Sequence, residues 1–237
     1  MQHATTPPAK NPCQLVLAHY QEDLQWVVEQ NWDNVVVYTK GPEGPTLNVD
    51  FPQIPLPNVG REAHTYLHHI VANYDDLADI TIFSQAGIAD HAGDNVRLSS
   101  LASQAADARE HGMTGFSRKH RFRDWDGVVY RFKWAEEVKS GTLGRASLTP
   151  GKFYEWVFGC PPPPTIPFYY GAIIGVHRHA ILARPRSFYE RLLAHFVGLG
   201  HANPEENHYM ERFWVAVFDP DWEKRPASDS DLALDFR

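Results

Sequence analysis

The sequence predicts an α/β domain with a mostly parallel central sheet flanked by helices. Strand-like and helix-like segments alternate over the first third of the chain, which is the pattern of such sheets. The chain has 237 residues, of which 43% are hydrophobic and 22% charged, as in an ordinary globular protein. A chain of this length buries a large core without a disulfide or structural metal.

The alternation begins with a short apolar run at residues 14–18, which predicts a strand. A helix is expected over residues 22–30, where two acidic residues open the first turn and apolar residues line one side. Residues 34–38 predict the second strand, which ends at a cluster of glycines and prolines. Residues 45–57 are rich in proline and predict an extended loop.

Residues 63–74 carry the strongest helical pattern, because apolar residues recur there with the period of one helix face. A third strand is predicted at residues 80–83. This alternation indicates parallel strands joined by right-handed crossovers. Ligands bind such sheets beyond the carboxyl ends of the strands. Those ends carry the pairs His19-Tyr20, Thr39-Lys40 and Ser84-Gln85.

The second half predicts further elements. A strand is expected at residues 169–176, and a helix over 203–218 has Asn203 as its expected N-cap and Pro204 at its first position. Other helices are expected at residues 98–111, 153–158 and 185–197. We predict a disordered N-terminus (1–12), one domain (13–218) and an acidic tail (219–237).

The totals exclude several classes of protein. A net charge of −7 argues against a nucleic-acid-binding protein. The first residues lack the apolar core of a signal peptide, and no apolar run is long enough to span a bilayer. The two cysteines, Cys13 and Cys160, favour free thiols in a reducing compartment over one long-range disulfide. We therefore expect a cytoplasmic protein.

A set of motifs resembles a family of fungal and bacterial proteins described only as a domain of unknown function. The resemblance spans about residues 14–218 and rests on Asn58-Val-Gly60-Arg61-Glu62 before Tyr66-Leu67, Asn73-Tyr74-Asp75-Asp76-Leu77, Phe83-Ser-Gln85-Ala-Gly87 and Glu211-Arg212-Phe-Trp214. The first motif is also similar to an Asn-x-Gly-Arg-Asp segment of some polysaccharide glycosyltransferases of the rhamnan-synthesis type. The resemblance implies a glycosyltransferase-A-like, Rossmann-like fold that binds a nucleotide-sugar co-substrate.

The expected donor site lies around the turn that leads into the helix at 63–74. Arg61 suits bidentate contact with a phosphate or base, and Glu62 would orient it or bind a ribose hydroxyl. Free N–H groups at a helix start also suit phosphate. The structural alternative is a surface ion pair with a helix-start acid. The full set of expected donor-binding residues is His19, Asn58, Gly60, Arg61, Glu62, Gln85, Arg118, Lys119 and Arg121.

Metal dependence is left open by the sequence. Many enzymes of the fold carry Asp-x-Asp after the third strand to hold Mn²⁺ or Mg²⁺, whereas this chain has Ser84-Gln85 there. Asp90, His91 and Asp94 are the candidate substitute ligands. Alternatively, the basic cluster at residues 118–123 offsets the charge of the leaving diphosphate, or it is a solvated loop.

Two carboxylates are candidates for the general base that an inverting transfer needs. Glu206 falls at the start of a late helix, and Glu211 belongs to the Glu-Arg-x-Trp motif. The structural alternatives are helix capping for Glu206 and pairing with Arg212 for Glu211. The candidate acceptor-binding residues are Tyr169, Tyr170, His177 and Arg178, which core packing and a strand end explain equally well.

The leading hypothesis is a glycosyltransferase-like enzyme that transfers a sugar from a nucleotide-sugar to an unknown acceptor. A second hypothesis is a non-catalytic binding protein that keeps the fold. A third is a metal-dependent hydrolase or transferase that uses His64 and His68, at i and i+4 of one helix, together with residues 90–94. A solvated helix face is the plainer interpretation of the two histidines.

Overall fold

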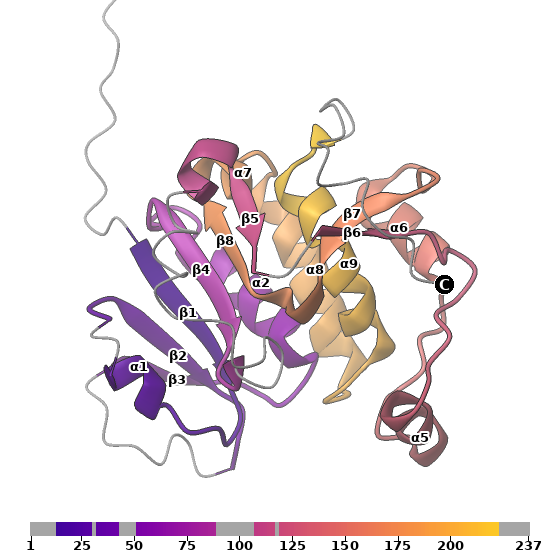
Figure 1. Ribbon diagram of the computed structural model, residues 1–237, viewed down its shortest axis with the longest axis horizontal. Helices are drawn as coiled ribbons and strands as arrows, with labels where there is room; N and C mark the ends of the chain where they lie inside the picture. Colours follow the sequence, from indigo (N-terminus) through magenta and orange to yellow (C-terminus); the bar gives the residue numbers. More distant parts are fainter. Residues whose placement is uncertain (1–12, 30–31, 43–50, 89–106, 117–118, 223–237) are drawn as a thin grey trace, which may run out of the picture.

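A six-stranded sheet forms the centre of the protein. The computed structural model describes residues 13–29, 32–42, 51–88, 107–116 and 119–222. The strand order is β3-β2-β1-β4-β8-β5 (Figure 1). These strands are β1 (Cys13–His19), β2 (Val35–Thr39), β3 (Gln53–Pro55), β4 (Ile80–Gln85), β5 (Met113–Gly115) and β8 (Ile174–His177).

The pairing of the strands confirms the expected mostly parallel sheet. Strand β1 lies between β2 and β4 and is parallel to both, and β3 is parallel to β2. Strand β8 is antiparallel to its neighbours β4 and β5. The carboxyl ends of β1, β2 and β4 therefore lie at the same end of the sheet, which points downward in Figure 1.

Helices and a small second sheet complete the described fold. The two-stranded sheet pairs β6 (Lys119–Phe122) with β7 (Ile166–Tyr169). The helices are α1 (Gln25–Glu29), α2 (Arg61–Asn73), α5 (Lys133–Ser140), α6 (Pro150–Phe158), α7 (Arg178–Leu182), α8 (Arg186–Leu199) and α9 (Glu205–Phe218), with a 3-10 turn at Tyr170–Ala172. Figure 1 shows α5 set apart at the end of an extended segment.

Residues of β1, β2 and β4 alternate between two apolar cores, as the pleat of a sheet requires. Val16, Val36 and Phe83 face the larger core with α2, α8 and α9. Leu15 and Ile82 face the smaller core, against which Trp26 and Trp32 pack. Strands β1, β2 and β4 are consequently buried on both faces.

The long helices agree with the sequence patterns, with small shifts at their starts. Helix α2 begins two residues before the apolar period, at Arg61. Helix α9 begins at Glu205, so the expectation that Asn203 is its N-cap is wrong, and Pro204 occupies the cap position. Helix α1 is shorter than expected, with five residues.

The predicted strand at residues 169–176 is wrong. The chain forms the end of β7, a turn at Gly171, and then β8, which belongs to the other sheet. Gly171 has φ 84° and Ala172 has φ 51°, so neither residue continues an extended strand. Within the predicted loop at 45–57, residues 53–55 instead form edge strand β3, which tolerates its terminal proline.

Several expectations fall on residues outside the described ranges. These are the ends 1–12 and 223–237 and the first part of the helix predicted at 98–111, whereas residues 107–111 are helical and end before Gly112. Cys13 and Cys160 are both free, as expected. None of the helices in the described ranges combines the length and apolar character needed to span a bilayer.

We expect Gly60→Ala to destabilise the fold by about 2–3 kcal/mol. Gly60 has φ 60°, and a Cβ there would lie 2.7 Å from Cδ1 of Phe196. Gly159→Ala is the matched control, because its φ is 73° and nothing lies within 4 Å of the added Cβ. The control should lose only about 1 kcal/mol, from backbone strain alone. Urea unfolding of both variants measures the difference, and equal losses would contradict the packing argument.

Candidate functional site

Two adjoining cavities open at the carboxyl ends of the parallel strands. The larger has a volume of about 930 Å³ and the smaller about 290 Å³. Glu22, Arg61 and Gln85 line both. His19, Lys40, Asn58 and Glu62 line the smaller cavity in addition, and Tyr170, Gly171, His208, Glu211 and Arg212 line the larger one. This is the edge where α/β sheets bind ligands.

A strained turn before α2 contributes Asn58 to the smaller cavity and Arg61 to both cavities. Gly60 and Arg61 have φ of 60° and 44°, a left-handed conformation that is rare for arginine. Lys40 holds this turn, because its Nζ donates to the carbonyl oxygens of Val59, at 2.6 Å, and of Arg61. We call residues 57–61 the elbow. Its conformation fixes where the side chain of Arg61 leaves the backbone.

Hydrogen bonds from the C-terminal half complete the elbow. The N–H of Gly60 donates to the carbonyl of His201 at 2.9 Å, and that of Arg61 donates to Ala202 at 3.1 Å. The N–H of Ala63 donates to Oδ1 of Asn207 at 3.1 Å. These N–H groups already have partners, so the expectation that the free helix start holds a phosphate is wrong. Side chains must supply the contacts to an anion.

Lys40 is itself an unusual group. Its side chain is buried, with 8% of the residue exposed. Burial lowers the pKa of Lys40 to about 7, with Arg61 adding to the effect and Glu62 opposing it. Its amine is therefore divided between charged and neutral forms near neutral pH, next to the smaller cavity.

Arg61 is oriented by a chain of polar contacts that reaches α9. Its Nε lies 3.4 Å from Oε2 of Glu62, and Nδ2 of Asn207 donates to Oε1 of the same carboxylate at 2.9 Å. Burial would raise the pKa of Glu62, but Arg61 and the Asn207 hydrogen bond outweigh it and hold that pKa below its usual value. Glu62 is thus an ionised, buried acid that positions Arg61.

The peptide of Gly171 lies between two site side chains. Nε2 of Gln85 donates to the Gly171 carbonyl at 3.0 Å, and the Gly171 N–H donates to Oε1 of Glu211 at 2.6 Å. The other oxygen of Glu211 pairs with Arg212. Arg212 also donates to the carbonyl of His208 at 2.8 Å. The sheet edge and helix α9 are therefore joined at the wall of the larger cavity.

Aromatic rings contact two of the arginines that line the larger cavity, Arg61 and Arg212. The guanidinium carbon of Arg61 lies 6.0 Å from the ring centroid of Trp134, and that of Arg212 lies 5.8 Å from Tyr170. Such contacts leave the N–H edges of a guanidinium available for a ligand. The ring of His208 packs edge-on against Trp134, with centroids 4.7 Å apart. Burial and Arg212 lower the pKa of His208 to about 4, so this ring is neutral at pH 7.

The structure brings together most of the expected donor-binding residues. His19, Asn58, Arg61, Glu62 and Gln85 line one or both cavities, and Gly60 shapes the elbow between them. Among the other candidates, Glu211 and Tyr170 line the larger cavity. The assignment of these residues to donor, base and acceptor stays a prediction.

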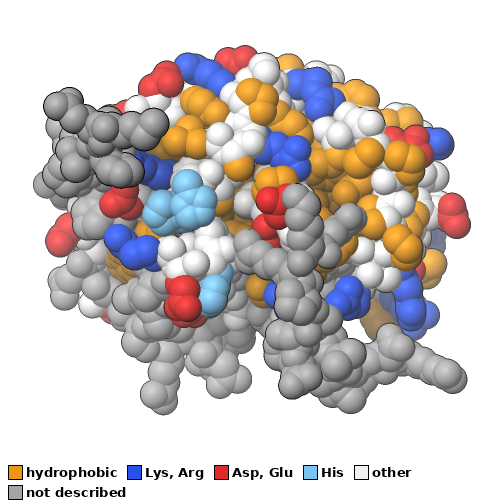
Figure 2. All heavy atoms as spheres, turned by 90° about the horizontal axis from the view of Figure 1, so that it is seen from above, with side chains coloured by type: hydrophobic (Ala, Val, Ile, Leu, Met, Phe, Trp, Pro, Cys, Tyr) orange, Lys and Arg blue, Asp and Glu red, His pale blue; other side chains and the backbone are white. Residues whose placement is uncertain are grey.

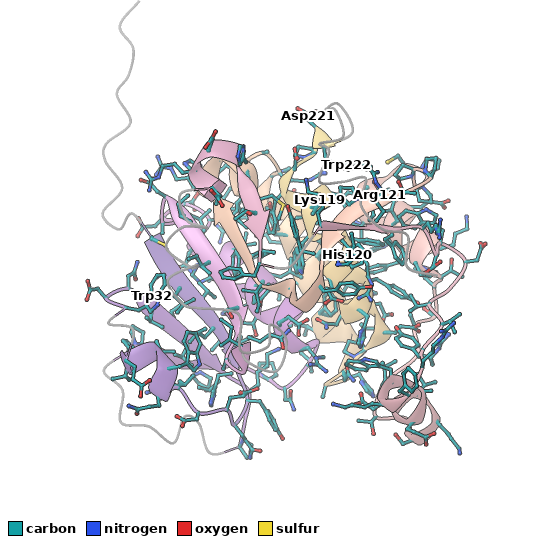
Figure 3. The ribbon with its side chains drawn as sticks, viewed as in Figure 1. Trp32, Lys119, His120, Arg121, Asp221 and Trp222 are labelled. Carbon is teal, nitrogen blue, oxygen red and sulfur yellow. The ribbon has the colours of Figure 1, made fainter. Side chains whose placement is uncertain are left out.

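The remaining candidates lie elsewhere or outside the described residues. Lys119 and Arg121 lie on β6 at the upper right of Figure 3, towards Trp222, and line neither cavity. Arg121 donates to the hydroxyl of Thr165. The predicted solvated loop at these residues is thus a strand of the small sheet. Arg118 lies outside the described residues.

Two acceptor candidates lie at the opposite end of the sheet. His177 pairs with Ile80, the first residue of β4, and Nε of Arg178 lies 3.5 Å from Oδ1 of Asp79. Figure 2 shows this upper face, where acidic, basic and histidine side chains are interspersed. Arg178 lines a separate cavity of about 240 Å³. Tyr169 packs against the larger core and lines neither of the two main cavities.

Glu206 is buried at the start of α9 and lines neither main cavity. Burial raises the pKa of Glu206, and the nearby charge of Glu205 raises it further. A backbone hydrogen bond and His201 partly oppose this increase. The neighbouring Glu205 accepts from the N–H of Ala146 at 2.9 Å and pairs with Arg145. The geometry therefore separates the two candidate bases, and Glu211 is the one at the larger cavity.

The histidine pair on α2 does not form a metal site within the described residues. His64 is buried, with 2% exposed, so the interpretation of a solvated helix face is wrong for it. The rings of His64 and His68 lie 6.3 Å apart, and no group of three potential metal ligands occurs among the residues that the structure describes. Asp90, His91 and Asp94 lie outside those residues.

Several residues at the site were not among the expected donor, base or acceptor residues. Lys40 follows a predicted strand, which is a usable signal. Asn207 and His208 lie on α9, whose apolar pattern predicts core packing and gives no signal for these two residues. Trp134 lies on α5, which no clear period predicts. Only tertiary contacts bring Lys40, His208 and Trp134 to the cavities and Asn207 to Glu62.

Arg61→Gln should lower the free energy of unfolding by about 2 kcal/mol at neutral pH, because it leaves Glu62 a buried and less compensated charge. The folded-state pKa of Glu62 is depressed, so its favourable contribution is present above its unfolded pKa and is lost as pH falls through the folded value. The difference between wild type and variant should shrink on acidification below about pH 4. Urea unfolding across pH tests this.

The control is Lys152→Gln, which breaks the exposed pair with Glu155 and should change stability by about 0.5 kcal/mol or less. A pH-independent loss in Arg61→Gln would show that Arg61 does not stabilise the ionised form of Glu62.

Sequence comparison places the chain in a family. A search of curated protein sequences found no match. The family model described as "Protein of unknown function (DUF3431)" matches residues 15–231. That range includes every residue that lines the two cavities. The protein therefore belongs to the DUF3431 family.

Proposed function

We propose that the protein is a glycosyltransferase-like enzyme that binds a nucleotide-sugar at the two cavities. The observation that carries the proposal is that the guanidiniums of Arg61 and Arg212, with Arg131 as a third, line one cavity at the carboxyl ends of parallel strands. Arginine is the side chain best suited to the oxygens of a diphosphate. The protein is acidic overall, but arginines line its larger cavity. This local positive charge favours the binding of a compact anion.

The smaller cavity is the proposed place for the nucleoside. Its volume is about 290 Å³, and the polar side chains of His19, Lys40 and Asn58 are part of its lining. Since Arg61 lines both cavities, a diphosphate beside it would have its nucleoside on one side and its sugar on the other. This agrees with the mostly parallel, glycosyltransferase-A-like arrangement that the motifs imply.

The larger cavity would hold the sugar and the acceptor. Glu211 is the proposed general base, which takes the proton of the acceptor hydroxyl as the hydroxyl oxygen bonds to the sugar carbon. The bond from that carbon to the diphosphate breaks, and the diphosphate leaves with the electron pair. Arg61 and Arg212 offset the charge that develops on it.

A divalent ion is not required by this arrangement of charges, although Mn²⁺ or Mg²⁺ can still participate. The carboxylates that line the two cavities are Glu22, Glu62 and Glu211. Glu62 and Glu211 pair with arginines, and Glu22 accepts the N–H of Tyr20 at 2.7 Å. These acids are occupied within the protein, so we propose that the arginines supply most of the positive charge.

A non-catalytic binding protein is the second candidate. The observation that favours it is Gln85, a neutral amide at the end of β4 whose nitrogen is already bonded to Gly171. Such a protein would bind the nucleotide-sugar without turnover. The hydrolase alternative would need residues 90–94, because the described residues offer no metal-binding group.

UDP-, GDP- or dTDP-sugars should raise the thermal midpoint of the protein, since a ligand of the native state stabilises it. Arg212→Gln should weaken binding of the stabilising nucleotide by about tenfold, because one charge-assisted contact is lost. Titration calorimetry with and without Mn²⁺ measures this. Arg178→Gln, at the opposite edge of the sheet, is the control and should bind normally. The absence of stabilisation by all three classes of nucleotide-sugar would refute the proposal.

Glu211→Gln should reduce turnover by about a hundredfold or more while nucleotide binding is kept, because the amide oxygen can still accept from Gly171 but takes up no proton. Glu206→Gln should leave turnover within about threefold. Donor hydrolysis, with water as acceptor, provides a measurable reaction when the acceptor is unknown. A large loss of turnover in Glu206→Gln, but not in Glu211→Gln, would assign the general base to Glu206. Nucleotide-sugar binding without hydrolysis by the wild-type protein would favour the non-catalytic binding protein.

A further inference from the structure

The segment of residues 128–134, which we call the rim segment, carries apolar side chains into solvent. All seven of its residues line the larger cavity. Phe132 is 88% exposed and Val129 is 79% exposed. The other large apolar side chains that the structure records as exposed range from 36% to 53%. Apolar groups presented so fully to water, next to a binding cavity, indicate contact with a partner.

The backbone holds Phe132 in this exposed position at an energetic cost. Phe132 has φ 51° and ψ −130°, a conformation that non-glycine residues rarely adopt and that tends to occur at functional sites. Its carbonyl accepts the N–H groups of Ala135 and Glu136, at 3.0 and 3.3 Å, at the start of α5. The conformation thus belongs to an ordered helix start.

The inner side of the segment is anchored to the candidate site. Trp134 packs against His208, with centroids 4.7 Å apart, and contacts Arg61 at 6.0 Å. Tyr130 packs against the same histidine at 5.6 Å. The rim segment therefore has two different sides, one fixed on the cavity wall and one apolar and exposed.

Basic residues flank the exposed Phe132 in the sequence. Arg131 and Lys133 are both exposed, and no acidic residue lies between positions 127 and 135. Lys133 pairs with the half-buried Glu137 at 3.7 Å, and its own side chain is 80% exposed. The whole chain carries −7, so this segment is a local reversal of charge. Apolar side chains beside Lys and Arg are the combination that binds the interface of anionic membranes.

We propose that the rim segment docks the protein on the surface of an anionic lipid membrane. Val129 and Phe132 enter the interface, and Arg131 and Lys133 contact the headgroups. The larger cavity then opens at the membrane surface, where a lipid-borne molecule can reach it. A carbohydrate acceptor stacked on Phe132 is the competing occupant, but the aliphatic side chain of Val129 and the outward charges favour the lipid interface.

Vesicle co-sedimentation of the full chain tests this inference. The protein should bind phosphatidylcholine vesicles that contain phosphatidylserine and should not bind phosphatidylcholine alone. Arg131→Gln/Lys133→Gln should weaken binding by about twenty-five-fold, since each charge contributes about fivefold. Val129→Ser/Phe132→Ser should weaken vesicle binding by a similar factor or more, because less apolar surface enters the interface. High salt should weaken binding of the wild type.

The control is Leu182→Ser/Val197→Ser, which changes two exposed apolar residues of α7 and α8 and should leave vesicle binding unchanged. All substituted side chains are exposed, so the urea midpoints of the variants should match wild type. No binding to phosphatidylserine vesicles, or equal losses in the control, would overturn the inference. Unchanged vesicle binding in Val129→Ser/Phe132→Ser with slower turnover of a soluble acceptor would assign the segment to a carbohydrate instead.

The inference does not depend on nucleotide binding. Binding to vesicles without binding to any nucleotide-sugar would support the docking surface and contradict the proposed function. Binding to a nucleotide-sugar without binding to vesicles would support the proposed function and contradict the docking surface.

Discussion

The hydrogen bonds from the buried amine of Lys40 to the elbow are the contacts on which the candidate site depends. The elbow contains two consecutive left-handed residues, Gly60 and Arg61, and such a conformation persists only when its surroundings over-determine it. Lys40 binds two of its carbonyl oxygens from the end of β2. The carbonyls of His201 and Ala202 bind its N–H groups from the other side. Without these contacts, Arg61 would have no fixed position between the cavities.

Helix α9 connects the core to the candidate site, because its two sides have different surroundings. Phe213 and Trp214 are buried in the larger core, whereas the two preceding residues, Glu211 and Arg212, line the larger cavity. This gives the Glu-Arg-x-Trp segment a physical interpretation: its two polar residues line the cavity and the tryptophan packs the helix into the core. The Gly171 turn, which interrupts the expected strand, provides the N–H group that Glu211 binds.

The sequence predicted those parts of the fold that local periodicity determines. The strands β1, β2 and β4, helix α2 and the edge that carries His19 and Gln85 follow from apolar patterns and topology. The kink at Gly171 did not, because a run of apolar residues looks alike whether it is one strand or two. The role of Asn207 also required the tertiary structure, since its partner Glu62 is 145 residues away.

The protonation of Lys40 would link the elbow to an anionic ligand in the smaller cavity. A neutral amine has two N–H groups, which suffice for the carbonyls of Val59 and Arg61. Protonation adds a third donor and a positive charge beside the smaller cavity. Because burial lowers the pKa of Lys40 to about 7, the charged form is only partly populated at neutral pH. An anion in the cavity would favour that form, so its binding would be coupled to proton uptake while the elbow kept its shape.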